Sequence, residues 1–135
     1  MKKRFAAVGI TSAALFTTLV TAGPAQAVNV VAFCRTTGAV GDILVYGYDS
    51  ARTDIILTIS VTDTLGDDHH ARVRLLTENH AGTVKKWPWR ENTAGVQETK
   101  SWNTTASESS GIHEVGVEVA RFEKNTRLNS CTDWG

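Results

Sequence analysis

The chain lacks the patterns that mark several large classes of protein. No window of its 135 residues places apolar side chains at i, i+3, i+4 and i+7 over three turns, so little or no helix is expected. It contains no glycine-rich phosphate-binding motif and no G-x-S-x-G nucleophile motif. Beyond residue 27, no apolar run approaches the roughly 20 residues that cross a bilayer. The missing helical period argues against a helical protein, and neither of these two catalytic or phosphate-binding motifs is present in the sequence.

An excess of positive charge is also missing. Lys and Arg together number 14, and so do Asp and Glu. Three of the basic residues stand in positions 1–4, ahead of an apolar run (residues 5–20) and the small-x-small sequence Ala25-Gln26-Ala27. This order is typical of a secretory signal peptide, because the run is too short for a membrane anchor and ends at a cleavage pattern. We expect residues 1–27 to be removed on export.

The mature protein would begin near Val28 and have 108 residues, enough for one domain with a single core. It keeps 11 basic and 14 acidic residues, which give a formal charge of −3. A protein that binds nucleic acid or an anionic membrane normally carries a basic surface. We therefore expect a secreted, extracellular β-domain, residues 28–135, with no nucleic-acid partner and no membrane contact after signal cleavage.

Cysteine is scarce as well, since only Cys34 and Cys131 occur. In an oxidising compartment, two cysteines near opposite ends of a domain favour a disulfide. Neither has another cysteine or a histidine at the spacing of a metal ligand. A Cys34–Cys131 bridge would close nearly the whole domain, which the chain-entropy model values at roughly 4–5 kcal/mol.

What the sequence does contain is alternation with a period of two. Across residues 54–62 every second position is apolar, and Thr and Ser fill most of the others; the apolar residues are Ile55, Leu57, Ile59 and Val61. After a polar turn at residues 63–68, the pattern resumes at Ala71, Val73 and Leu75. The two runs predict half-buried strands that form an antiparallel hairpin.

Further strands are predicted along the rest of the mature chain. Alternation returns at Val115, Val117 and Val119, and weaker candidates are residues 28–34, 42–48, 83–89, 96–103 and 127–131. Seven or eight short strands in about a hundred residues are typical of an antiparallel β-sandwich, with a small β-barrel as the alternative. The disulfide would join the first strand to the last.

The densest group of polar side chains is the loop at residues 63–70, with three carboxylates and two histidines. One interpretation is a metal site, with calcium ahead of zinc because oxygen ligands dominate. The spacing does not fit an EF-hand, and His69 and His70 would point to opposite faces of a strand. Because Asp and Gly are also the residues expected at an exposed turn, we favour a turn and predict no metal and no cofactor.

Two groups of charged residues allow a catalytic or a structural interpretation. His113 and Glu114 are neighbours in the sequence, and on a strand their side chains would project to opposite sides. Arg72 and Arg74 would form cross-strand ion pairs with Glu114 and Glu118 if their two strands are adjacent. We favour the structural interpretation of both groups.

Two tryptophans, Trp87 and Trp89, flank Pro88, the only proline beyond the expected signal peptide. Because proline cannot donate to a strand ladder, this segment is predicted at a sheet edge, in a bulge or in an extended loop. On an extended backbone the two rings would share one face. Together with Arg90 and Trp102 they form a candidate recognition surface, since Trp and Arg dominate binding hot spots. The alternative is that the rings seal the end of the sandwich.

The sequence therefore predicts a secreted binding protein whose ligand is an extracellular protein, as for an inhibitor, or a polysaccharide. The candidate ligand-binding residues are Trp87, Trp89, Arg90 and Trp102. A small secreted hydrolase is one alternative, and a structural cell-surface protein without a specific ligand is another. The hydrolase hypothesis is weaker because no local motif pairs a nucleophile with a base, and no catalytic residue is predicted.

Overall fold

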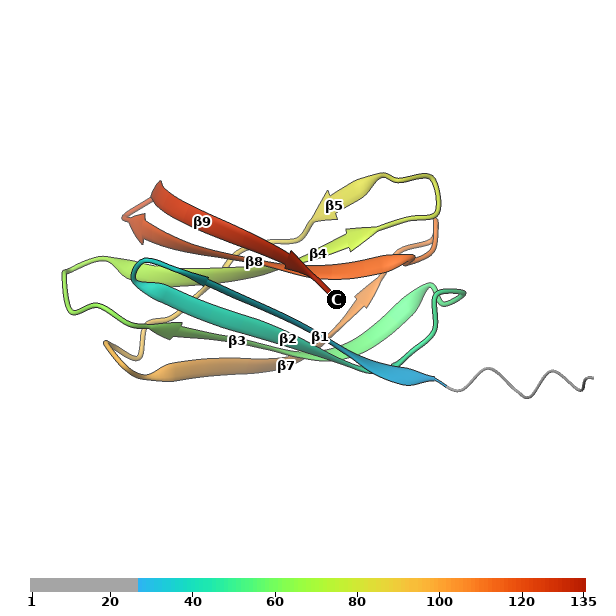
Figure 1. Ribbon diagram of the computed structural model, residues 1–135, viewed down its shortest axis with the longest axis horizontal. Helices are drawn as coiled ribbons and strands as arrows, with labels where there is room; N and C mark the ends of the chain where they lie inside the picture. Colours follow the sequence, from blue (N-terminus) through green and yellow to red (C-terminus); the bar gives the residue numbers. More distant parts are fainter. Residues whose placement is uncertain (1–26) are drawn as a thin grey trace, which may run out of the picture.

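The computed structural model describes residues 27–135, which form nine β-strands and no helix. The strands make two antiparallel sheets that stack face to face (Figure 1). The four-stranded sheet has the order β1-β2-β3-β7; the five-stranded sheet has the order β5-β4-β8-β9, and β6 also pairs with β4. The predicted all-β sandwich is confirmed, and the described strands do not close into a barrel.

Seven of the nine strands have nine or ten residues, and the two consecutive strands β5 and β6 have three and two. Their bounds are β1 Val28–Thr36, β2 Ala39–Tyr48, β3 Asp54–Asp63, β4 His70–Glu78, β5 Val84–Lys86, β6 Arg90–Glu91, β7 Thr99–Ser107, β8 Glu114–Glu123 and β9 Thr126–Trp134. Sequence reasoning expected one strand over residues 83–89, where the structure has β5, a break and then β6. The next strand was predicted to begin at residue 96, whereas β7 begins three residues later, at Thr99.

The core lies between the two sheets and is built from the alternating apolar faces. The largest fully buried side chains include Ile43, Leu57, Ile59 and Ile112, with valines from β2, β3, β4 and β8. The sheets approach closely at Gly41, where a Cβ atom would lie 2.9 Å from Val119 Cγ2 and 2.7 Å from the Ser60 carbonyl oxygen. Glycine is therefore required there for the two layers to pack at this distance.

The predicted hairpin between residues 54–62 and 71–75 is wrong. Both strands exist, as β3 and β4, but β3 belongs to the four-stranded sheet and β4 to the five-stranded sheet. The loop at residues 64–69 carries the chain across, and Asp68 within it has a φ of 61°. Alternation cannot distinguish a neighbour in one sheet from a partner across the core, because both arrangements bury the same face.

The expected signal peptide, residues 1–27, lies outside the described residues except for Ala27. Within residues 27–135, no helix is long and apolar enough to cross a membrane.

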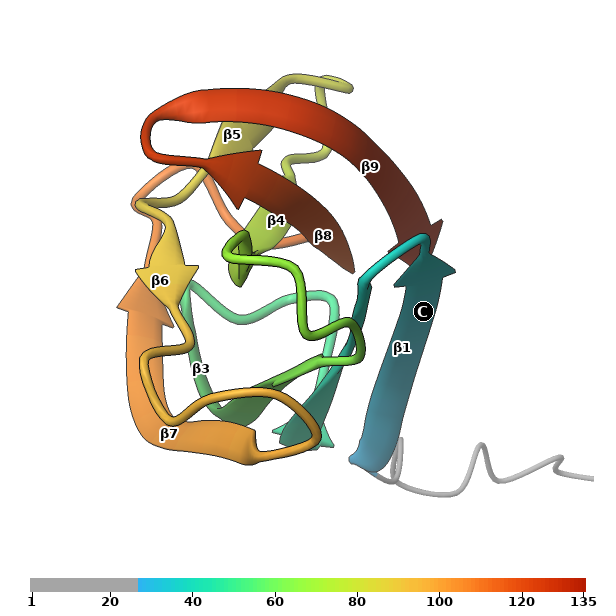
Figure 2. The ribbon, with the colours of Figure 1, turned by 90° about the vertical axis from the view of Figure 1, so that its left-hand side faces the viewer.

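The two sheets meet along two sides, which are seen end-on in Figure 2. On one side β9 curves over to β1, and we call this the disulfide side. On the other side β7 faces residues 84–91, which follow the edge of β4. We call these residues the edge segment and this side the cleft side.

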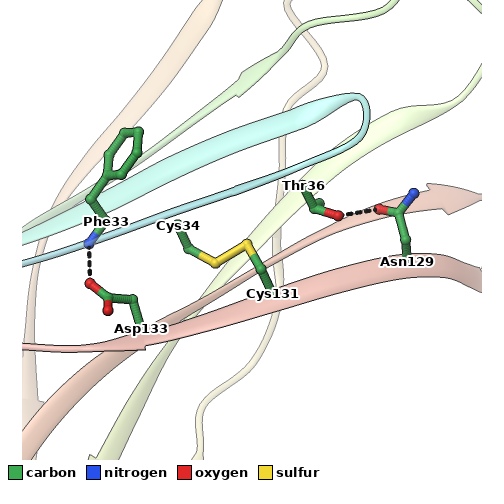
Figure 3. Close-up of a disulfide and its surroundings, with 6 residues drawn as sticks. All are labelled: Phe33, Cys34, Thr36, Asn129, Cys131 and Asp133. Carbon is green, nitrogen blue, oxygen red and sulfur yellow. Dashed lines mark hydrogen bonds between the residues drawn. A yellow bond between two sulfur atoms is a disulfide. The ribbon is translucent and has the colours of Figure 1, made fainter.

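The predicted disulfide closes the disulfide side. Cys34 of β1 is bonded to Cys131 of β9, so the bridge joins the first and last strands and also joins the two sheets (Figure 3). On one flank the Phe33 backbone N–H donates to Asp133 Oδ2 at 2.9 Å. On the other flank the hydroxyl of Thr36, also in β1, donates to an amide oxygen of β9. The bridge is confirmed as a covalent tie between the layers.

Candidate ligand-binding cleft

A cleft of about 370 Å³ opens on the cleft side, between β7 and the edge segment. Its walls come from β3, β4, β7 and the edge segment. The lining residues are Leu57, Ile59, Leu75, Trp87, Pro88, Trp89, Arg90, Thr104, Thr105 and Ala106. Three of the four residues predicted as a recognition surface thus line one cavity.

The edge segment is irregular because it has one residue more than the strand it follows. Lys86 of β5 is opposite Leu76, and Arg90 of β6 is opposite Val73. Two residues of β4 therefore face three of the edge segment, which is the pattern of a β-bulge. Pro88 is central to the bulge and has no N–H to pair. The prediction that Pro88 places this segment at a sheet edge or bulge is confirmed.

Trp87 points toward the core side of the five-stranded sheet. Its indole Nε1–H donates to Thr77 Oγ1 at 3.0 Å, and its backbone N–H donates to the Leu75 carbonyl at 3.0 Å. Thr77 is 2% exposed, so the indole satisfies a hydroxyl that water does not reach. Above the ring, the Lys85 ammonium lies 4.3 Å from its centroid. Trp87 is half-buried, packs on the core and forms one wall of the cleft.

The ring of Trp89 packs on the outer face of the same sheet. The guanidinium carbon of Arg74 lies 4.2 Å from its ring centroid, and the Phe122 ring meets it edge-on with 5.3 Å between centroids. The expectation that Trp87 and Trp89 share one face is wrong, because the bulge at Pro88 interrupts the regular alternation. Trp89 contributes to the cleft wall, while its ring stabilises the outer face.

Arg90 reaches across the cleft and connects the two sheets. Its Nη2 donates to Thr104 Oγ1 on β7 at 3.1 Å, and its Cζ lies 5.7 Å from the ring centroid of Trp102. The ammonium of Lys100 lies 5.6 Å from the same centroid. Trp102 is half-buried against the core, so it flanks Arg90 from β7 and lies beside the cleft lining.

The cleft has an apolar floor and a cationic rim. The floor is made of the buried side chains Leu57, Ile59, Leu75 and Ala106. Among the lining residues Arg90 alone is charged, and no carboxylate is present. Thr104 of β7 adds a hydroxyl to one wall, where it accepts from Arg90, and Thr105 of the same strand also lines the cleft. Such a lining suits an apolar group that carries an anionic or hydrogen-bond-accepting group beside it.

Sequence reasoning missed the β7 wall and the floor of the cleft. Thr104 and Thr105 follow Trp102 after one intervening residue, and their inclusion depends on the pairing of β7 with β3. Alternation indicated that Leu57 and Ile59 face inward, but no local pattern indicated which strand would lie opposite the edge segment. The hydroxyl-rich character of residues 99–105 was the one available signal.

The charged residues on the outer face of the five-stranded sheet pair with one another. Glu118 is 4% exposed, and its Oε2 accepts a hydrogen bond from Arg74 Nε at 2.7 Å. This predicted cross-strand ion pair is confirmed. Arg72 instead contacts Glu91 of β6 at 3.2 Å, because Glu114 lies at the far end of the β4–β8 pair.

The acidic loop at residues 63–70 uses its polar groups within the protein. Asp63 Oδ1 accepts the Leu65 N–H at 3.1 Å, and the Asp67 carboxylate accepts from the Arg121 side chain. Desolvation opposes the shift, but hydrogen bonds from His69 and the charge of Arg121 hold the pKa of Asp67 below its ordinary value. Within residues 27–135, no three His, Cys, Asp or Glu side chains are grouped to hold one metal ion.

His113 lies against a second histidine. The rings of His113 and His80 have their centroids 4.7 Å apart, and His80 Nε2 contacts the Ser50 carbonyl oxygen at 2.9 Å. In the part of the chain that the structure describes, no serine hydroxyl is hydrogen-bonded to a histidine ring. The histidines therefore form no nucleophile–base pair in this arrangement.

Comparisons of the chain with models of protein families, with curated proteins and with solved structures found no match. The geometry of the cleft is therefore the basis of the proposed function.

Proposed function

We propose that the protein is an exported binding protein whose cleft receives an apolar side chain of an extracellular protein, with an acidic group beside it. The lining of the cleft carries this proposal: an aliphatic floor, the Trp87 wall and Arg90 as its charged group. An aliphatic side chain gains affinity by leaving water for the floor. A neighbouring carboxylate gains it by pairing with the planar guanidinium of Arg90.

The state of the tryptophan rings supports a protein ligand over a sugar at this site. A sugar ring binds an aromatic side chain by lying flat on the ring face. Each candidate tryptophan already has a cation over its ring; the pairs are Lys85–Trp87, Arg74–Trp89, Arg90–Trp102 and Lys100–Trp102. A sugar would have to displace these cations, whereas a side chain entering the cleft would not.

The lining residues also support binding over acid–base catalysis. Catalytic acids and bases need a pKa near the working pH, as His, Glu, Asp, Lys or Cys side chains can have. The cleft lining contains none of these residue types, and its one ionisable group is the guanidinium of Arg90.

Two features support export. The Cys34–Cys131 bridge is of the kind that persists in oxidising compartments, and residues 1–27 have the order of a signal peptide. N-terminal sequencing of the protein from culture medium should give Val28 as the first residue. Recovery of chain that still begins at Met1 would contradict this part of the proposal.

A titration with two small probes tests the cleft. N-acetyl-leucine has an aliphatic side chain and a carboxylate, and N-acetyl-leucine amide has the same side chain without the charge. In NMR spectra we expect both to shift the Trp87 Nε1–H and Thr104 methyl signals. The carboxylate form should bind roughly tenfold more tightly, since a charge-assisted bond to Arg90 is worth about 1.4 kcal/mol or more.

Arg90→Gln should remove the preference for the carboxylate and leave the amide unchanged. Arg35→Gln is the matched control, because Arg35 is an exposed arginine on β1, away from the cleft lining. Shifts confined to residues outside the cleft would contradict the proposal, and so would an Arg90→Gln variant that keeps the preference. A protein captured from culture medium by the parent and not by Arg90→Gln would then identify the partner.

A further inference from the structure

The outer face of the four-stranded sheet forms a regular array of side chains. The strand register aligns four rows of outward residues: Val31, Phe33 and Arg35 of β1; Val40, Asp42, Leu44 and Tyr46 of β2; Ile56, Thr58, Ser60 and Thr62 of β3; Thr99, Ser101, Asn103 and Thr105 of β7. Neighbouring strands lie about 4.8 Å apart, and successive outward residues on a strand about 6.7 Å apart. The array is thus a broad platform.

One half of this face, on β7 and the part of β3 from Thr58 to Thr62, carries paired hydroxyl and amide groups. Cross-strand hydrogen bonds join Thr58 to Asn103 at 2.8 Å, Ser60 to Ser101 at 3.0 Å and Thr62 to Thr99 at 2.6 Å. In the first of these, Asn103 accepts through Oδ1, which leaves its exposed Nδ2 group free to donate. These bonds hold the polar groups in fixed positions.

The other half carries exposed rings. Phe33 is 53% exposed and Tyr46 is 45% exposed, and Val31 and Ile56 extend the apolar area. The Tyr46 hydroxyl is held by Thr58 Oγ1 at 3.1 Å. Unlike the three candidate tryptophans, neither ring has a cation over it among the described residues. About half of each side chain is exposed, and that surface is available to a ligand.

Asp42 lies where the two halves meet. Its neighbours across the strands are Phe33 and Ser60. The carboxylate is half-buried and makes no hydrogen bond or ion pair with any described residue, and burial raises its pKa. Because the carboxylate is only half-buried, its oxygens still reach water, and a ligand hydroxyl can replace that water as the hydrogen-bond donor.

We propose that the outer face of the four-stranded sheet binds a neutral, β-linked polysaccharide. Tyr46 and Phe33 stack on the apolar C–H faces of sugar rings, and Asp42 and Asn103 hydrogen-bond to sugar hydroxyls. The charge on this face argues against a polyanionic ligand, since its charged residues are Arg35, Asp42 and Asp54, one cation and two carboxylates. A polyanion would require several cations. A ribbon-like β-linked chain matches the extended platform.

Depletion from solution by microcrystalline cellulose and by chitin tests this proposal. The mature protein should bind at least one solid in a saturable way. The Phe33→Ala, Tyr46→Ala double variant should bind at least about tenfold more weakly, because aromatic anchors dominate such interfaces. Asp42→Asn, which keeps the side-chain shape, should bind about three- to tenfold more weakly through loss of a charged acceptor. Leu128→Ala changes an exposed apolar residue of β9 in the other sheet, and this variant should bind as the parent does.

The controls separate binding by this face from general loss of exposed apolar surface and from unfolding. The mutated side chains are exposed or half-buried, so circular dichroism should show the parent fold, and Asp42→Asn provides an independent second variant. Absence of binding to both solids overturns the proposal, and so does undiminished binding by the double variant. A parent dimer that the double variant abolishes, without binding to either solid, would assign the face to a second copy of the chain instead.

Discussion

The two sides of the sandwich are closed by different means. On the disulfide side, the Cys34–Cys131 bond joins β1 to β9, with hydrogen bonds on both flanks (Figure 3). On the cleft side, contacts between side chains join the edge segment to β7, and a cavity of about 370 Å³ remains between them. One side is covalent and the other is held by contacts that a ligand could exchange.

Because only one side is closed by a covalent bond, we infer that the disulfide side stabilises the fold and that the cleft side is suited to binding. The disulfide lowers the conformational entropy of the unfolded chain, because it links residues near the two ends of the domain. This stabilisation does not depend on the side chains of the cleft side. The cleft side can then retain polar contacts of modest strength, such as the 3.1 Å bond from Arg90 to Thr104. A binding site is expected where the scaffold is held by other parts of the molecule, and the cleft side meets this condition.

The largest expected effect is on the disulfide side. The double variant Cys34→Ala, Cys131→Ala should lose about 4–5 kcal/mol of unfolding free energy, because the bridge spans a sequence separation of 97 residues. Urea denaturation of oxidised parent and variant measures it. The double variant Arg90→Gln, Lys100→Gln on the cleft side should lose less than about 1 kcal/mol. Equal losses from the two sides would remove the distinction between them.

Asn92 is the buried anchor of the cleft side and should give the next largest effect. It is 3% exposed, and its Nδ2 donates to the carbonyls of Val61 and Glu98 at 3.1 and 2.7 Å. Asn92→Ala should lower the unfolding free energy by about 2–3 kcal/mol, since two carbonyl groups lose a partner. The exposed Asn125→Ala is the control and should lose less than about 0.5 kcal/mol. Similar values for both, measured by urea denaturation, would show that Asn92 is not an anchor.

The hydrogen bond between Trp87 and Thr77 should contribute a smaller amount. A double-mutant cycle with Trp87→Phe and Thr77→Val should give a coupling of about 0.5–1.5 kcal/mol, because the bond involves a hydroxyl that is 2% exposed. Thermal or urea unfolding of the four proteins measures it. Strict additivity of the two substitutions would mean that the bond adds nothing to the closure of the cleft side.

The smallest effect is a pH dependence near the cleft. The hydrogen bond from Lys85 to Glu108, at 2.6 Å, and the charge of Lys85 lower the pKa of Glu108 below its ordinary value. A depressed folded pKa adds stability above the ordinary carboxyl pKa, and that stability is lost as the pH falls through the folded pKa. Carbon-detected NMR titration should place the Glu108 pKa lower in the parent than in Lys85→Met. Lys86→Met is the control and should leave the Glu108 pKa unchanged. If the Glu108 pKa were also unchanged in Lys85→Met, Lys85 would not be the cause of the lowered value.

Much of the fold followed from local patterns, whereas the candidate site followed only in part. Alternation at Ile55, Leu57 and Ile59 indicated a strand, and a strand is found there. The same alternation gave the wrong partner, since β4 lies in the other sheet. Strand partners are chosen by contacts between distant residues, and each apolar face is equally satisfied by several neighbours.

The tryptophans show the same limit at the level of the site. Pro88 indicated an edge or bulge because its missing N–H is a local covalent property. The opposite placement of the Trp87 and Trp89 rings depends on the number of residues between two pairings with β4, which no local pattern records. Trp102 was selected correctly as a neighbour of Arg90, but its position beside the lining depends on the pairing of β7 with β3.

The sequence by itself determined the β class, the disulfide partners and the irregular edge at Pro88. Each of these rests on chemistry that needs no tertiary context: side-chain alternation, a pair of cysteines without competitors, and an imide nitrogen without hydrogen. Only the tertiary structure decided which strands are neighbours. It therefore decided which residues line the cleft and which lie on the outer face of the four-stranded sheet. The physical reason is that strand pairing depends on contacts between residues far apart in the sequence. The cleft and the outer face of the four-stranded sheet form only when those contacts are made.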